Sequence, residues 1–196
     1  MNKYLIVALL FLGIVSCTEK SDKTSSTEKE EVITEKNYQE LGNNITNTSQ
    51  KTLLTHVGSA MKMGGPLAAI QYCNINAMTI TDSLSKAFDV RISRVTDKNR
   101  NSANVLKNED LTIWKHYNSG EINIQMGDTV VAIEGKNVYY KPIYIANPVC
   151  LNCHGQSGTD IMDFTLAKIE EFYPEDLAKE YNLGELRGLW KVEFKK

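Results

Sequence analysis

Three residues with reactive side chains stand together in the stretch Cys150-Leu151-Asn152-Cys153-His154. The C-x-x-C-H spacing is typical of covalent attachment of a c-type haem. Two thiols separated by two residues can each add across one vinyl group of the same haem, which forms two thioethers. His154 follows directly and can supply the proximal ligand of the iron. The stretch therefore predicts one covalent haem c. A C-x-x-C pair also occurs in zinc sites and redox disulfides, and both stay open as alternatives.

The first 17 residues have the pattern of an export signal that ends in a cysteine. Lys3 is followed by an apolar run over residues 4–15, which is too short for a membrane span. The run leads through Ser16 into Cys17 and resembles the lipobox of bacterial lipoproteins. We expect cleavage before Cys17 and lipid on its sulfur, the alternative being an ordinary signal peptide. The protein would then be anchored to the lipid bilayer of a bacterial cell envelope, with its domain facing the periplasm or the cell exterior.

Composition and length indicate one folded domain. The chain has 196 residues and a formal net charge of −2, with acidic and basic residues mixed. It shows no basic patch typical of nucleic-acid binding, so we expect no nucleic-acid partner. Residues 18–36 have almost no apolar side chains and bury too little surface to fold. We predict a flexible polar tether over residues 18–50, although 37–50 are compatible with a helix start, and a folded domain over 51–196.

The order of the expected elements predicts an α+β domain. From Lys51 onward apolar residues repeat every three to four positions, which indicates a helix ending at Gly64-Gly65. Pro66 suits the first turn of a second helix, which runs to Phe88. Further helices are expected over residues 108–120, capped by Asn108, and over 163–172 and 174–181. Strands are expected over residues 90–95, 122–126, 129–134, 138–145 and 186–194. Because turn residues separate neighbouring strands, the sheet is predicted to be antiparallel.

Cys73 is the cysteine that remains after these assignments. It lies on the apolar stripe of the second helix, at helical spacing from Ile70 and Ala77, so we expect it to point inward. A leftover thiol in an oxidising compartment calls for a reason. From the residues alone, Cys73 is either a small buried hydrophobe or a second ligand of the iron. The competing candidates for that second ligand are Met61, Met63, Met78, Met126, Met162, His56 and His116.

Four basic residues, Arg91, Arg94, Lys98 and Arg100, stand close together after the second helix. A haem carries two propionates, and guanidinium groups match carboxylates in a two-pronged way. Arg94 and Arg100 are therefore candidates for propionate binding. The alternative is a solvated, charged loop.

Several stretches follow one another in the order found in one known family, namely Ala69-Ile70-Gln71-Tyr72-Cys73, Arg94 to Asn104, Pro142-Ile143, Cys150 to Gly155, Tyr173 to Asp176, Gly184 and Arg187-Gly188. Together they resemble the single-haem c-type proteins with a PAS-like fold, a haem-binding domain found in free periplasmic or lumenal proteins and in sensor regions of signalling proteins. The resemblance implies a PAS-like antiparallel sheet with N-terminal helices and a covalently bound haem c. It also implies His154 as proximal ligand and Cys73 as a second, thiolate ligand. Ser102 and Glu180 depart from the family pattern, which usually has proline and glycine there.

A thiolate ligand would have direct consequences for function. It donates electron density and stabilises iron(III), so the reduction potential should be low. An iron with both axial positions filled has no vacant site for substrate, so we expect no enzyme. The sequence thus predicts an envelope c-type cytochrome in electron transfer or redox sensing, working with a separate redox or signalling partner protein. The alternative is a haem-based sensor of diatomic gases in which Cys73 dissociates on reduction. A haem peroxidase is a third hypothesis, and it lacks an obvious distal His–Arg pair.

Overall fold

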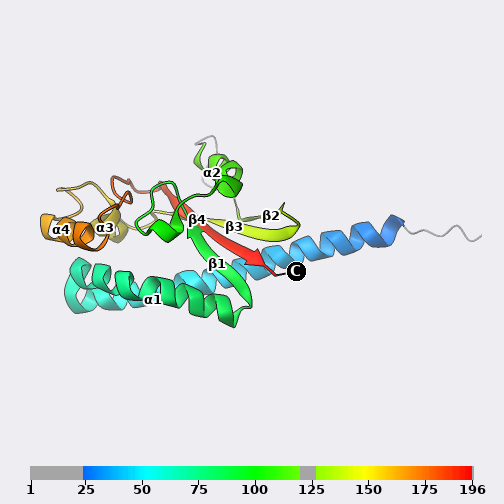
Figure 1. Ribbon diagram of the computed structural model, residues 1–196, viewed down its shortest axis with the longest axis horizontal. Helices are drawn as coiled ribbons and strands as arrows, with labels where there is room; N and C mark the ends of the chain where they lie inside the picture. Colours follow the sequence, from blue (N-terminus) through cyan, green and yellow to red (C-terminus); the bar gives the residue numbers. More distant parts are fainter. Residues whose placement is uncertain (1–23, 120–126, 196) are drawn as a thin grey trace, which may run out of the picture.

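The computed structural model describes residues 24–119 and 127–195. It shows a long bent helix packed on a four-stranded antiparallel sheet, with short helices at one end (Figure 1). The predicted α+β class is confirmed. The helices are α1 (Thr24–Ala87), α2 (Leu111–Asn118), α3 (Leu151–His154) and α4 (Asp163–Phe172), with short 3-10 turns η1 (Ser102–Asn104), η2 (Asn108–Asp110) and η3 (Pro148–Cys150). The strands are β1 (Val90–Val95), β2 (Thr129–Ile133), β3 (Lys136–Tyr144) and β4 (Leu186–Phe194).

The helix α1 is a hairpin of two arms. Gly64 and Gly65 leave the helical conformation, and Gly65 has φ 66° and ψ −157°, a combination that favours glycine. Pro66 follows in the first turn of the returning arm, where its missing N–H costs nothing. The predicted break between two helices is therefore confirmed. We call residues 24–63 the first arm and residues 66–87 the second arm.

The first arm begins well before residue 51, so the predicted tether over residues 18–50 is wrong for the helical part. Gly42 lies so close to the Tyr139 ring that an added Cβ would stand 2.3 Å from a ring atom. Ile45 is fully buried in the core between α1 and the sheet. Gln39 donates hydrogen bonds to Asp128, at 2.8 Å to its backbone oxygen and 2.9 Å to Oδ1. Residues 37–50 thus belong to the folded domain.

Polar residues pack in this part of α1 because they satisfy their own hydroxyl groups. Thr46 Oγ1 donates to the backbone oxygen of Gly42 at 2.9 Å, and Ser49 Oγ donates to that of Ile45 at 2.8 Å. Both side chains are fully buried. A hydroxyl bonded back to the helix leaves no unpaired donor in the core. This local pairing does not appear as hydrophobicity in the sequence, so residues 37–50 were assigned to the tether although a helix start was possible there.

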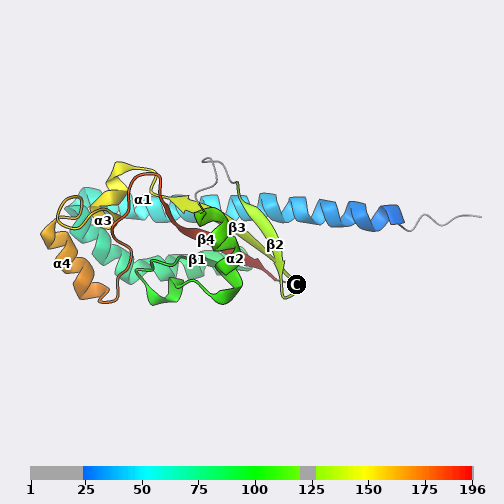
Figure 2. The same ribbon diagram turned by 90° about the horizontal axis from the view of Figure 1, so that it is seen from above.

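The sheet has the order β1-β4-β3-β2, with every neighbouring pair antiparallel (Figure 2). The last strand, β4, lies between β1 and β3, so the C-terminus of the domain forms the middle of the sheet. The strands predicted over 90–95, 129–134, 138–145 and 186–194 are confirmed within one or two residues. The strand predicted over 122–126 lies outside the described residues.

Alternation along the strands gives the sheet two different faces. Tyr139, Trp190 and Val192 face α1 and form the larger core. Tyr140 and Leu189 point the other way and pack with aromatic residues of α2. In both ribbon views α1 covers one face of the sheet and α2 lies over the other (Figures 1 and 2). Within the described ranges, none of the helices combines the length and the apolar character needed to cross a membrane.

The α2 face contains a buried group of charges that we call the sheet cluster. Lys191 Nζ lies 2.6 Å from Glu109 Oε1, 2.8 Å from Asp110 Oδ1 and 3.6 Å from Glu193 Oε1. The hydroxyl of Tyr140 donates to Asp110 Oδ1 at 2.6 Å. Asp110, not the predicted residue 108, is the N-cap of α2, and its side chain makes no capping bond because these partners hold it in the core.

Candidate functional site

The C-x-x-C-H stretch folds as two short helical turns, η3 followed by α3. Asn147 caps η3 by accepting a hydrogen bond from a backbone N–H at 3.0 Å, and Pro148 opens the turn. Cys150 and Cys153 then stand three residues apart on a helical turn, which brings their side chains to the same side. Both are free thiols and half-buried. The local sequence thus presents two thiols and the imidazole of His154 together.

The imidazole of His154 has a fixed tautomer. Its Nδ1 lies 2.8 Å from the backbone oxygen of Ala178, which can only accept, so Nδ1 carries the proton. Burial, with the positive charges of nearby arginines, holds the pKa of His154 well below its usual value. The ring is therefore neutral, and its Nε2 keeps a lone pair for a metal. A hydrogen bond from the other ring nitrogen to a carbonyl is the usual support of a metal-binding histidine.

The segment 174–181 supplies that carbonyl, and it is not the helix that the sequence predicted. Its backbone N–H groups bond to the haem-motif stretch instead. Tyr181 N–H donates to the backbone oxygen of His154 at 3.0 Å, and Glu180 N–H donates to that of Gly155 at 3.0 Å. Because these two N–H groups donate to residues far away in sequence, they cannot form the i to i−4 hydrogen bonds of a helix. The prediction of a helix over 174–181 is therefore wrong.

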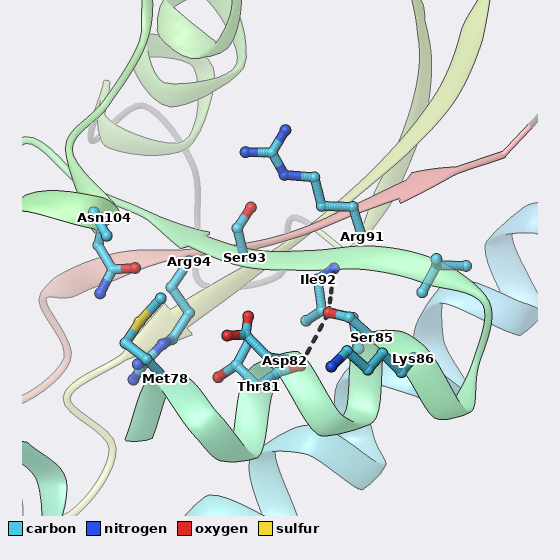
Figure 3. A pocket seen from close by; sticks show the side chains of 12 residues that line it. Met78, Thr81, Asp82, Ser85, Lys86, Arg91, Ile92, Ser93, Arg94 and Asn104 are labelled. Atoms are coloured by element: carbon cyan, nitrogen blue, oxygen red, sulfur yellow. Dashed lines mark hydrogen bonds between the residues drawn. The ribbon is translucent and has the colours of Figure 1, made fainter. Parts of the chain in front are cut away.

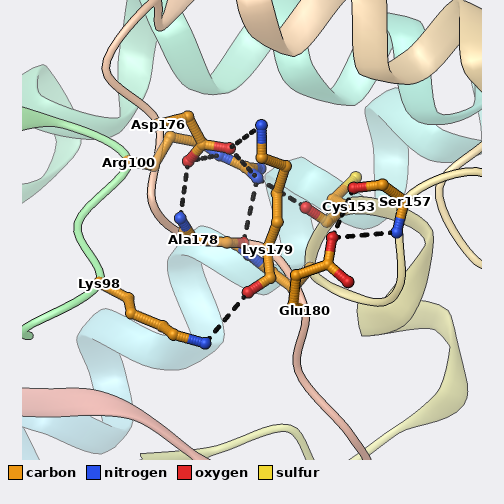
Figure 4. Close-up of polar contacts among 9 residues, drawn as sticks. Lys98, Arg100, Cys153, Ser157, Asp176, Ala178, Lys179 and Glu180 are labelled. Atoms are coloured by element: carbon orange, nitrogen blue, oxygen red, sulfur yellow. Dashed lines mark hydrogen bonds and ion pairs between the residues drawn. The ribbon is translucent and has the colours of Figure 1, made fainter.

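A buried ion pair, which we call the motif clamp, holds this segment against the motif. Arg100 Nε lies 3.0 Å from Asp176 Oδ1, and Arg100 Nη2 lies 3.1 Å from Asp176 Oδ2 (Figure 4). The same Nη2 donates to the backbone oxygens of Cys153 at 2.6 Å and Ala178 at 3.3 Å. The side chains are 12% and 1% exposed for Arg100 and Asp176. The Nε and Nη2 donors of Arg100 are thus used by Asp176 and by two backbone oxygens, and the sequence-based role of Arg100 toward a propionate stays a prediction.

Cys73 lies on the second arm of α1, close to the motif. Ile70, one helical turn earlier, packs in the same cluster as Cys153. The side chain of Cys73 is free and half-buried. Burial raises the pKa of its thiol, while the charges of Arg94 and Arg100 act in the opposite direction. The fold therefore brings Cys73, more than 70 residues away in sequence, into the electrostatic surroundings of the C-x-x-C-H stretch.

The competing sulfur and nitrogen candidates lie in different surroundings. Met63 and Met162 are exposed. His56 stacks on Tyr72 with 5.6 Å between ring centroids. Met61 is half-buried on the first arm, His116 is exposed on α2, and Met126 is outside the described residues.

Met78 lines a pocket of about 360 Å³ between the second arm and β1 (Figure 3). The charged residues Asp82 and Lys86 of the second arm and Arg91 of β1 also line the pocket. Arg94 closes one end, with its guanidinium on the side of Met78 (Figure 3). Its carbon Cζ lies 5.7 Å from the centroid of the Trp190 ring. Its Nε is buried and has no hydrogen-bond partner among the described residues.

Arg187 is a site residue to which the sequence assigned no role. Its Nη1 donates to the backbone oxygen of Lys98 at 3.2 Å, and its Cζ lies 5.5 Å from the Tyr181 ring centroid. Burial lowers the pKa of Arg187 to about 10. The signal that could have pointed to Arg187 is a charged residue at the start of a strand whose other residues are almost all buried.

Known proteins share this architecture. A family model of Tll0287-like proteins matches residues 19–194. The chain belongs to the Tll0287-like family. The crystal structure of the cyanobacterial heme-protein Tll0287 is similar, with a TM-score of 0.60 and 21% sequence identity over 81% of this chain and 96% of that chain. At this identity the likeness shows a shared fold. No curated protein matches the chain.

In this Tll0287-like chain the predicted site residues come from three parts of the fold. The second arm of α1 contributes Cys73, and α3 with its preceding turn contributes the C-x-x-C-H residues. Arg94 belongs to β1, and Arg100 belongs to the loop that follows it. The predicted lipidation site, Cys17, lies outside the described residues. The structure adds Asp176, Ala178 and Arg187 to this set.

Proposed function

We propose that the chain binds one haem c covalently through Cys150 and Cys153, with His154 as proximal ligand and Cys73 as the second axial ligand. The hydrogen bond from His154 Nδ1 to the Ala178 carbonyl carries this proposal, because it fixes the tautomer that leaves Nε2 for iron. Membership of the Tll0287-like family, with one solved relative described as a heme-protein, supports it. The PAS-like classification of the fold is part of the same proposal.

The residues present fit such a group. Two free thiols stand on one helical turn beside a neutral imidazole, and a further thiol stands on the second arm. The bound haem would supply one-electron chemistry at its iron. Arg100 and Asp176 hold the backbone on both sides of His154 and so orient the imidazole. Burial around His154 keeps the imidazole neutral, so Nε2 has no proton to lose when it binds the iron.

The function that follows is electron transfer or redox sensing by a low-potential haem. His154 and Cys73 come from separate elements, which suits axial ligands on opposite sides of a haem, and a ligand at both positions leaves none for substrate. We therefore propose a cytochrome rather than an enzyme. Lipid on Cys17 would hold the domain at a bacterial envelope, facing the periplasm or the cell exterior, where a separate protein exchanges electrons or receives the signal.

The deciding experiment is haem retention after denaturation. Protein expressed with the c-type attachment machinery should keep its haem through acid-acetone extraction and stain for haem on a denaturing gel. The double variant Cys150→Ala/Cys153→Ala should lose the stain. The single variant Cys73→Ser is the matched control, since it removes a thiol outside the motif and should keep the stain. Haem that extracts freely from the wild-type protein would refute covalent attachment.

Lipid anchoring is tested separately. Radiolabelled palmitate should enter the wild-type protein in a host with the lipoprotein pathway, and Cys17→Ala should remove the label. Label that is absent from the wild type would leave an ordinary signal peptide as the explanation of residues 1–17.

Gas sensing is the second candidate, and the position of Cys73 favours it. Burial disfavours a free thiolate, so the sulfur of Cys73 would stay ionised only with a ferric haem bound to it. A reduced haem would have one positive charge fewer and would hold Cys73 less strongly. Carbon monoxide should then bind the reduced protein and not the oxidised one. A reduced protein whose absorption spectrum ignores carbon monoxide would leave electron transfer as the function.

A further inference from the structure

Three half-buried arginines, Arg94, Arg100 and Arg187, lie at the candidate site. Arg100 Nη2 donates to the backbone oxygen of Cys153 at 2.6 Å, and Arg187 rests on the ring of Tyr181, whose backbone N–H donates to the backbone oxygen of His154. Asp176 pairs with Arg100. Neither Arg94 nor Arg187 forms an ion pair with an acidic side chain anywhere in the described ranges. Two guanidinium groups therefore remain without a counter-charge.

The two arginines come from the same end of the sheet. Arg94 is the penultimate residue of β1, and Arg187 is the second residue of β4. The register pairs Val95 with Leu189, so the end of β1 lies beside the start of β4. Segment 174–181 leads from the C-x-x-C-H contacts directly toward that start of β4. The sheet thus brings both residues to the same end, from which segment 174–181 reaches the C-x-x-C-H stretch.

Each arginine has donors left over. Arg94 Nε is buried and finds no acceptor among the residues described. Arg187 Nη1 donates to the backbone oxygen of Lys98 at 3.2 Å and lies 3.5 Å from Thr96 Oγ1, and its other nitrogens donate to no residue in the described ranges. Both rest against aromatic faces, at 5.7 Å from Trp190 and 5.5 Å from Tyr181. Ring faces offset only part of the cost of burying a cation.

A buried charge without a partner is costly, so a site built this way calls for an anionic ligand. Haem has two propionate groups, and a carboxylate accepts two parallel hydrogen bonds from one guanidinium. Two available guanidinium groups match two carboxylates. Arg100, the third, already has Asp176 for that geometry.

We propose that Arg94 and Arg187 bind the two haem propionates, one each, while Arg100 is a positioning residue for the C-x-x-C-H stretch. This assignment rests on the proposed haem function and replaces Arg100 by Arg187 in the pair of candidates suggested by the sequence. The guanidinium groups would keep the propionates ionised and their charge neutralised. The reduction potential should then be higher than it would be with bare propionates beside the iron.

The test uses the haem-loaded protein and the variants Arg94→Gln, Arg187→Gln and the double variant. Resonance Raman bands of the propionate groups should shift for one propionate in each single variant and for both in the double. The reduction potential should fall in each variant. It should also fall as pH rises through the neutral range, because a propionate without its arginine binds a proton when the haem is reduced. The wild-type potential should stay nearly constant over that range.

Arg91→Gln is the matched control. Arg91 lies on the same strand, three residues from Arg94, but its side chain is 66% exposed and near Glu193. Its removal should leave the Raman bands and the pH profile unchanged. Where a glutamine variant fails to fold, Arg94→Lys and Arg187→Lys keep the charge but lose the planar fork, so the Raman bands must still shift.

The outcomes separate this proposal from the one it rests on. Unshifted propionate bands in folded variants with attached haem would overturn the assignment and leave the two arginines as structural residues. Wild-type protein that loses its haem on acid-acetone extraction would instead overturn covalent haem binding itself.

Discussion

Two buried ion pairs join distant parts of this chain, one in the scaffold and one at the candidate site. In the sheet cluster, Lys191 of β4 lies 2.8 Å from Asp110 at the start of α2. In the motif clamp, Arg100 lies 3.0 Å from Asp176. Each pair is almost completely buried, and each ties a loop or helix start to another layer of the fold. As single contacts, the two pairs are much alike.

The surroundings of the two ion pairs differ in the sign and the location of the charges that remain unpaired. Around Lys191 the surplus is acidic, and it reaches water, because the side chains of Glu109 and Glu193 are 42% and 20% exposed. Around Arg100 the surplus is basic, and it lies in the half-buried Arg94 and Arg187, where burial lowers the pKa of both guanidinium groups. A surplus charge in water needs no partner, whereas a surplus charge in the interior does. The comparison therefore supports our proposal that the sheet cluster completes the scaffold, whereas the charges at the candidate site need an anionic ligand.

The largest loss of stability is expected for Asp176→Asn. It leaves Arg100 with no other carboxylate in the described structure and loosens the Ala178 carbonyl that holds His154. Breaking a buried pair on one side costs about 4 kcal/mol. We also expect a changed EPR spectrum of the haem-loaded protein, because the orientation of His154 depends on this pair. Chemical denaturation and EPR give the two readouts.

Glu175→Gln is the control for that variant, since it alters the exposed neighbouring carboxylate. It should change neither readout. If Asp176→Asn destabilised the fold but left the EPR spectrum of wild type, the clamp would be scaffold alone and the contrast between the two regions would disappear.

The next effect in size is expected for Asp110→Asn. Lys191 would lose its closest buried carboxylate but keep Glu109 at 2.6 Å, so the loss should be smaller, about 3 kcal/mol. Because the sheet cluster lies on the α2 face, the reduction potential and EPR spectrum should stay those of wild type. A shifted EPR spectrum in this variant would show that the scaffold and the site are not separable.

Local patterns account for what the sequence could predict. The C-x-x-C-H stretch, the break at Gly64-Gly65-Pro66 and four strands each depend on neighbouring residues, and the structure shows the break and the strands as expected. Cys73 could be singled out because helical spacing predicted its inward position. In each case the determining interactions lie within one or two turns of helix or one strand.

The missed features depend on partners far away in sequence. The ion pair of Arg100 with Asp176, 76 residues later, could not be predicted, because nothing near Arg100 in the sequence reveals that partner. Segment 174–181 looked helical because its backbone bonds to the C-x-x-C-H stretch are not encoded locally. Residues 37–50 were assigned to the tether although a helix start was possible there, because the bonds of their hydroxyls to the helix itself and their contacts with the sheet are not visible in the sequence.

A smaller effect on stability is expected for Cys73→Ser, which tests the site and not the scaffold. The half-buried side chain changes by one atom, so the free energy of unfolding should change less than in either ion-pair variant. The oxidised wild type should give a low-spin EPR signal of the thiolate-ligated type. In Cys73→Ser that signal should disappear and the reduction potential should rise, while the haem stays attached. A signal that persists unchanged would return Cys73 to the role of a buried hydrophobe.

The smallest effect is expected for Glu109→Gln, the neighbour of Asp110 in the sheet cluster. Both carboxylates contact Lys191, but Glu109 is largely solvated, so its removal should cost less than about 1 kcal/mol. The hydrogen bond from Lys191 holds the pKa of Glu109 below its usual value. Its contribution is therefore complete above the pKa of the unfolded chain, about 4.3, and is lost as pH falls through the lower pKa of the folded state.

The difference in stability between wild type and Glu109→Gln should accordingly be small at neutral pH and vanish in acid, as measured by urea unfolding over a series of pH values. Asp110→Asn, measured beside it, should show the larger loss at neutral pH. Glu109 and Asp110 both contact Lys191, and they then differ in their effect on stability because the carboxylate of Glu109 is in water and that of Asp110 is not. If Glu109→Gln lowered the free energy of unfolding as much as Asp110→Asn, solvent exposure would not decide how much a charge contributes. Exposure could then not distinguish the unpaired charges of the sheet cluster from those at the site. The inference that Arg94 and Arg187 need an anionic ligand would then lose its physical basis.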